Sequence, residues 1–173
     1  DLYRDSISRA MLRRKDGARS VAHAPPPPLE ATCGEEACLL PVNRATLSAG
    51  WTPVDAEKDT VYTNDKGRTQ AMMRGAVRCA KAGETLTLKW NGTTVGMSDI
   101  PYDEPMVVEA VVDGGKPVVM RRAKTAEKLK HARFWYLPEQ APGDHTVTFT
   151  VRQLAEGQYF YAGQILIVGK PGP

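Results

Sequence analysis

The stretch "HTVTFTVRQL" (145–154) alternates between apolar and polar side chains. Val147, Phe149 and Val151 lie on one side of an extended chain, and the threonines between them lie on the other. "ETLTLKW" (84–90) repeats the pattern with Leu86, Leu88 and Trp90. Such alternation predicts antiparallel strands with one face buried and one face in water, as in a sandwich of two sheets.

Further stretches of strand character follow the same rule, and short turn sequences such as "DGG", "APGD" and "AEGQ" separate them. Asn91-Gly92 predicts a tight hairpin between two of these strands. About eight such strands without a fixed repeat predict a mainly β, antiparallel, jelly-roll-like β-sandwich over residues 58–173. The other expected strands are 71–79, 93–97, 106–112, 117–122, 132–137 and 159–169.

The residues before the sandwich divide into two segments. Residues 1–22 have the apolar stripe of an amphipathic helix, formed by Tyr3, Ile7, Ala10 and Met11. A lone helix of this length is marginal in water, so its stripe is expected to lie against another surface. Residues 23–57, with four consecutive prolines, are either a strap that crosses a neighbouring domain or a plain spacer.

Composition excludes several classes of protein. The chain has 173 residues, enough for one domain and an extension, and its apolar and charged fractions are those of a globular protein. Its net charge of +3 comes entirely from residues 1–19, so the rest lacks the basic footprint of a nucleic-acid-binding protein. No apolar run reaches the ~20 residues of a membrane span.

The three cysteines leave alternatives open. Cys33 and Cys38 are close enough in sequence for a local disulfide, and the alternatives are reduced thiols or, less favoured, a metal site. With that bridge formed, Cys79 would be unpaired and buried as a small apolar residue. A bridge would favour an oxidising compartment.

Sequence motifs for catalysis are lacking, and no cofactor is expected. His145 is expected to have a structural role, and "SDIPYDEP" (98–105) is expected to be a solvated loop. The sequence therefore disfavours a small enzyme built on His131 or on the acidic loop.

Aromatic side chains are the better candidates for binding, because rings beside polar groups form platforms for sugars. Core packing is the alternative for at least half of them. Phe134 and Trp135 face opposite ways, so one of the two is expected to be outside. The candidate ligand-binding residues are His131, Trp135, Trp90, Tyr102 and Tyr161.

Three phrases, "LKWNGTTVGM", "VDGG" and "LPEQAPGDHTVTFTV", carry a resemblance to a known family. The span that contains them resembles the β-sandwich accessory domain of SGNH (GDSL-type) hydrolases, many of which are carbohydrate esterases. "HAPPPPLEATCGEEACLLPVNRATLSAGW" is similar to the strap that joins the two domains in such proteins. "DLYRDSISRAML" is similar to the last helix of the hydrolase domain.

The resemblance implies an accessory, carbohydrate-binding-like domain of an exported esterase, secreted or periplasmic. Its partners would be a preceding α/β hydrolase domain or subunit and a polysaccharide. The family's Gly-Asp-Ser block and Asp-x-x-His motif do not occur in the sequence, so these 173 residues are expected not to catalyse the reaction alone. The alternative is a structural or assembly protein that docks through its N-terminal helix and strap.

Overall fold

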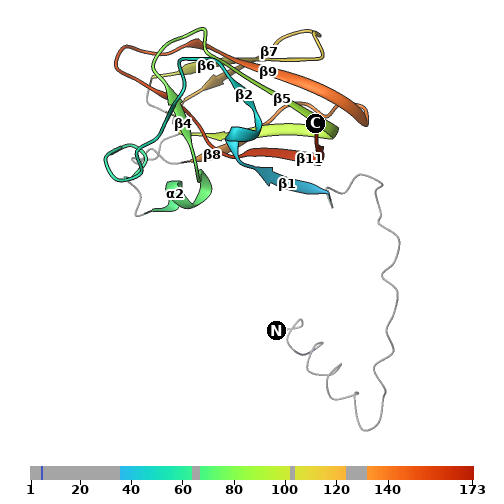
Figure 1. Cartoon of the computed structure of the whole chain (residues 1–173), viewed down its shortest axis with the longest axis horizontal. Coiled ribbons are helices and arrows are strands. Elements are labelled where there is room, and N and C mark those ends of the chain that lie inside the picture. The colour runs from blue at the N-terminus through green and yellow to red at the C-terminus, as the bar shows by residue number, and fades with distance from the viewer. Residues whose placement is uncertain (1–4, 6–35, 64–66, 102–103, 124–131) are drawn as a thin grey trace. The chain divides into compact units, whose positions relative to one another are not determined.

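Strand β5 (Thr85–Asp99) organises the domain by pairing with four other strands (Figure 1). One of its edges pairs antiparallel with β9 along Thr85–Gly92 and with β8 along Gly96–Asp99. The other edge pairs with β2 and β11. Two segments far apart in the sequence therefore flank each half of this strand.

The computed structural model describes residues 5, 36–63, 67–101, 104–123 and 132–173. The helix expected over 1–22 and most of the strap lie outside the described residues, and Gly34–Pro173 forms one structural unit.

The described strands form two antiparallel sheets. The main sheet has the order β1-β11-β5-β9-β6-β7, with β2 and β8 also paired to β5, and the small sheet has the order β10-β4-β3. The remaining elements are β1 (Ala37–Leu40), the 3₁₀ helix η1 (Val42–Arg44), β2 (Thr46–Leu47), β3 (Thr52–Pro53), α2 (Arg68–Met72), β4 (Val77–Cys79), β6 (Met106–Val112), β7 (Val118–Arg122), β8 (Arg133–Tyr136), β9 (Gly143–Gln153), β10 (Phe160–Ala162) and β11 (Ile165–Pro171).

The two halves of β5 lie in different layers of a sandwich. Phe149 pairs with Leu86 and Trp135 pairs with Met97, so their partners are far apart along one strand. An extended strand would separate those partners by about 36 Å at roughly 3.3 Å per residue. The rings of Trp135 and Phe149 are nevertheless in edge-to-face contact, with centroids 5.4 Å apart. The main sheet must therefore bend until its two halves face each other, which confirms the predicted β-sandwich.

The bend coincides with a bulge at Gly92 and Thr93. The core-facing positions change phase there, from Trp90 before the bulge to Val95 after it, and the register with β11 shifts at the same point. A Cβ atom on Gly92 would lie 1.9 Å from the carbonyl oxygen of Val168, so the backbones approach more closely than any side chain allows. The hairpin predicted at Asn91-Gly92 was wrong, because this glycine serves a bulge inside one strand.

Three other expectations on element boundaries need correction. Residues 71–79 are not one strand, because α2 precedes β4 and the side chain of Met73 is buried between them. Residues 159–169 are divided at Gly163 into β10 and β11, which belong to different sheets. The second half of the expected strap supplies β1, β2 and β3, which pair with strands of the sandwich.

A single apolar core fills the space between the layers. The largest fully buried side chains include Trp90, Tyr161, Phe160, Met73, Leu86 and Met97. Cys79 is 1% exposed, as expected for an unpaired cysteine, and burial raises the pKa of its thiol to about 12. The thiol is therefore not a nucleophile at neutral pH.

Candidate functional site

The structure describes three of the five predicted ligand-binding residues, and all three are buried. Trp90, Trp135 and Tyr161 are 1%, 7% and 1% exposed, and each lies in the core, the alternative that the sequence had left open. His131 and Tyr102 lie outside the described residues.

Trp135 belongs to a buried charge network. Its indole N–H donates to Asp99 Oδ2 over 2.9 Å, and Arg122 binds the same carboxylate through two nitrogens at 2.7 and 3.0 Å. Asp99 is 0% exposed. Burial raises the pKa of Asp99, while Arg122 and the Trp135 N–H act in the opposite direction. The network fixes the ring of Trp135 inside the core.

Tyr161 belongs to a second network of the same kind. Its hydroxyl donates to the carboxylate of Asp59 at 2.9 to 3.0 Å, and Arg78 pairs with that carboxylate at 2.5 Å. Asp59 also accepts the backbone N–H groups of Val61 and Tyr62. Because the Asp59 carboxylate accepts hydrogen bonds from all of these groups, it ties the loop before α2 to the small sheet.

His145 forms an acid–base pair with Asp113. Its Nδ1 lies 2.6 Å from Asp113 Oδ2, and its Nε2 lies 2.7 Å from the carbonyl oxygen of Ala141. Because both neighbours are acceptors, only the doubly protonated ring donates to both. Asp113 first, and then Ala141, raise the pKa of His145. Both ring nitrogens are therefore engaged, and His145 links the turn of Asp113 to the loop of Ala141.

We expect a pH-dependent stability from this pair. The contribution of His145 is complete below its unfolded pKa of about 6.5 and is lost as pH rises through its higher folded value. Asp113, whose pKa is lowered chiefly by His145, contributes above about pH 4. The free energy of unfolding, measured in urea across pH, should therefore decline above about pH 6.5. In His145→Gln that part of the decline should disappear, and an unchanged profile would contradict the assignment.

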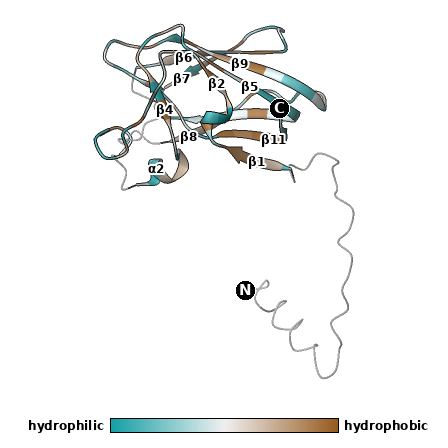
Figure 2. Cartoon of the chain, in the orientation of Figure 1, coloured by the Kyte–Doolittle hydropathy of each residue, from teal (hydrophilic) through white to brown (hydrophobic). Residues whose placement is uncertain are grey.

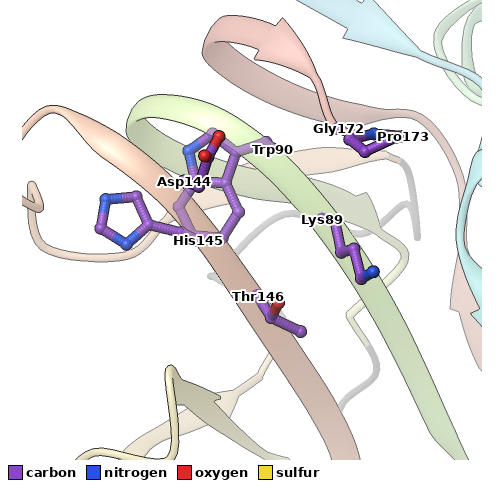
Figure 3. A pocket seen from close by; sticks show the side chains of 7 residues that line it. All are labelled: Lys89, Trp90, Asp144, His145, Thr146, Gly172 and Pro173. Carbon is purple, nitrogen blue, oxygen red and sulfur yellow. The ribbon is translucent and has the colours of Figure 1, made fainter.

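A shallow pocket of about 290 Å³ lies beside His145 (Figure 3). Figure 3 shows Lys89 and Thr146 pointing to one side of β5 and β9, while His145 points to the other. Asp144 accepts a hydrogen bond from Asn91 Nδ2 over 2.8 Å. The pocket offers polar groups, but its Trp90 ring is too deeply buried to form a platform for a sugar. Its lining residues are Lys89, Trp90, Asp144, His145, Thr146, Gly172 and Pro173.

One layer consists of β8, the second half of β5, β11 and β1, and its outer face carries an exposed aromatic ring. Tyr136 is 50% exposed and pairs directly with Gly96 across the ladder. A Cβ atom on Gly96 would lie 2.6 Å from the Tyr136 Cδ1 atom, so the ring lies against the sheet at the place where a side chain is missing. The Tyr136 side chain is thus partly covered at Gly96 and half open to solvent. This arrangement is an aromatic platform of the kind that stacks on an apolar sugar face.

A row of apolar residues continues from Tyr136 across the sheet. Gly96 pairs with Leu166, and Leu166 pairs with Leu39, so the four residues share one face of β8, β5, β11 and β1. Leu39 is 47% exposed and Leu166 is partly exposed. We call this row, Tyr136, Gly96, Leu166 and Leu39, the apolar strip. The ribbons of β1 and β11 are apolar along most of their length (Figure 2).

Sequence reasoning missed Tyr136 as the exposed ring, although a signal was present. In "RFWY" (133–136) the alternation places Phe134 and Tyr136 on the face opposite Trp135. Phe134 is partly exposed and Trp135 is buried, so the expectation that one of these two lies outside is confirmed.

Within the described ranges, no group of three or more His, Cys, Asp or Glu side chains could hold a metal ion. The predicted Cys33–Cys38 bridge involves Cys33, which is not described, and the Cys38 thiol is free with its Sγ 3.9 Å from the Gly169 carbonyl oxygen. No helix in the described part of the chain is long and apolar enough to cross a membrane.

The described strands define an antiparallel β-sandwich domain that carries a half-exposed tyrosine ring on one outer face. No protein-family profile and no curated protein matches the sequence. Solved structures do match: a two-domain esterase (CEX) active on acetylated mannans superposes with a TM-score of 0.66 and 17% identity over 98% of this chain and 46% of that one.

A family two carbohydrate esterase from Cellvibrio japonicus has a TM-score of 0.57 and 11% identity over 79% of this chain and 36% of its own. The Agl-KA catalytic domain has a TM-score of 0.53 and 15% identity over 79% and 28%. This chain thus spans less than half of each of these three proteins. At these identities the likeness establishes the fold, and it confirms at that level the resemblance to a β-sandwich of carbohydrate esterases.

Proposed function

We propose that this chain contains the accessory, carbohydrate-binding β-sandwich of an exported SGNH-type carbohydrate esterase, which does not catalyse the reaction itself. The observation that carries the proposal is Tyr136, whose half-exposed ring lies against the sheet at Gly96. Its role would be to hold a polysaccharide beside the active site of an α/β hydrolase domain or subunit.

Two further observations support an auxiliary role. The one histidine–carboxylate pair among the described side chains, His145 and Asp113, is saturated by its own loops. The structural relatives include an esterase active on acetylated mannans, which makes mannans the first ligands to test. Secretion and the hydrolase partner remain part of the proposal, as do ligand roles for Tyr102 and His131.

Replacing Tyr136 tests the proposal directly. Tyr136→Ala should lower the affinity of the chain for acetylated mannan by about tenfold or more, because the stacking surface is lost. Isothermal titration calorimetry with soluble acetylated glucomannan measures the change. Val119→Ala is the matched control, since Val119 is 57% exposed on β7 and outside the strip.

Stability should hardly change in Tyr136→Ala, because the ring is half in solvent. If neither the original chain nor the control binds any neutral polysaccharide, the proposed function fails. If the chain forms concentration-dependent oligomers and binds no glycan, the assembly alternative replaces it.

A further inference from the structure

We propose that the apolar strip binds an internal segment of a linear, uncharged polysaccharide, laid across the strands from Tyr136 toward Leu39. This inference rests on the proposed function and specifies the ligand of that site. Three properties of the strip support it: its length, its lack of charge and its open ends.

The length of the strip follows from its position in the sheet. Its four residues occupy successive strands β8, β5, β11 and β1, joined by direct pairing. Adjacent strands lie about 4.8 Å apart, so the strip extends for about 14 Å perpendicular to the strands. This is longer than one sugar ring, and it favours several consecutive sugars over a monosaccharide.

Charge is absent from the strip and from the rows on either side of it. Ser98 pairs with Phe134 on one side, and Val168 pairs with Thr94 and Ala37 on the other. The other layer contains the first half of β5, β9 and β6. Its outer face is charged, because it carries Lys89, Glu109 and Arg152. An uncharged face suits a neutral glycan, whereas an acidic polysaccharide would find no cation on it.

The size of this face argues against a protein as its main occupant. Ser98 is 0% exposed, so its row adds little open surface to the strip. The strip and the row through Val168 span about 7 Å along the strands, which gives an open face of about 100 Å². A partner in a standard protein interface contributes about 800 Å². The face is therefore too small for a stable protein contact by itself, while a sugar chain needs only a narrow apolar track.

Both ends of the strip are open. Leu39 lies on β1 and Tyr136 lies on β8, and each of these strands pairs with a single described neighbour, β11 and β5 respectively. These two side chains are 47% and 50% exposed, so about half of each remains open to solvent. A chain can therefore continue past the strip in both directions, which is the requirement for binding within a polysaccharide and not at its terminus.

The experiment compares ligand length in the full chain by calorimetry with mannobiose, mannotriose and mannopentaose. Affinity should rise with each longer ligand. Leu39→Ser should lower the affinity for mannopentaose about fivefold and leave mannobiose unchanged, because only the longer ligand reaches β1. Val119→Ser, an exposed aliphatic control on β7, should change neither.

The outcomes separate the two proposals. Equal affinity for all three ligands, or equal loss for short and long ligands in Leu39→Ser, overturns the strip and leaves Tyr136 as a binding platform. Binding of polygalacturonate as tight as that of mannan also overturns it. Concentration-dependent dimers that Leu39→Ser dissociates would assign the face to a second copy. Absence of binding to any neutral glycan overturns the proposed function itself.

Discussion

Arg122→Met should destabilise the domain by about 3–5 kcal/mol at neutral pH, because it leaves a buried carboxylate without its cation. Asp99 is 0% exposed and accepts two hydrogen bonds from Arg122. Without Arg122 the main group that lowers the pKa of Asp99 is gone, so burial raises that pKa further. The loss should therefore shrink as pH falls and Asp99 becomes neutral. Urea denaturation at neutral and acidic pH measures both effects.

Two further variants make this result specific. Asp99→Asn combined with Arg122→Met should recover part of the loss, since a neutral amide oxygen still accepts the Trp135 N–H. Arg152→Met removes an ion pair with Glu109 from the surface, where Arg152 is 52% exposed, and should cost less than about 1 kcal/mol. Similar losses in Arg122→Met and Arg152→Met would contradict the importance of burial.

Trp90→Ala should cost about 3–5 kcal/mol, the usual range for removal of a buried tryptophan ring. Trp90 is 1% exposed, and its ring lies against His145 with centroids 4.9 Å apart. Trp90→Phe should cost less than half as much, because it keeps an aromatic ring in the core and none of the described residues accepts a hydrogen bond from the indole N–H. Circular dichroism in urea gives the free energy of unfolding for both.

Glycan binding distinguishes a core role for Trp90 from the ligand role first predicted. Folded Trp90→Phe should bind mannan as the original chain does, whereas Tyr136→Ala should not. Loss of binding in folded Trp90→Phe would return Trp90 to the binding site. A cost below about 1 kcal/mol for Trp90→Ala would show that the ring is not part of the core.

Strands in which apolar and polar side chains alternate regularly could be predicted from the sequence. Residues 146–151 of β9 and residues 85–90 of β5 alternate, and both stretches were predicted as strands with nearly the observed bounds. Asn91-Gly92 misled because it has the local signature of a hairpin. What decides its conformation is Gly169, whose backbone lies against it from a distant part of the sequence.

The candidate site was harder to predict for a similar reason. Alternation indicates that Trp135 and Tyr136 face opposite ways, but it does not say which face is covered. Trp135 is covered because Asp99 and Arg122 meet it from two other strands. Such polar networks depend on long-range contacts, so aromatic residues that look alike in sequence divide into core and surface only in the folded chain.

The passage of β5 through both layers has a consequence for folding. Proteins can open locally in cooperative units that often coincide with supersecondary motifs. Here a continuous hydrogen-bonded strand belongs to both, with β9 on one half and β8 on the other. Opening either layer therefore disturbs the hydrogen bonds that β5 makes in the other layer, beginning at the bulge. The domain should therefore lose both layers in one cooperative step, and its most slowly exchanging amides should report a single free energy of opening.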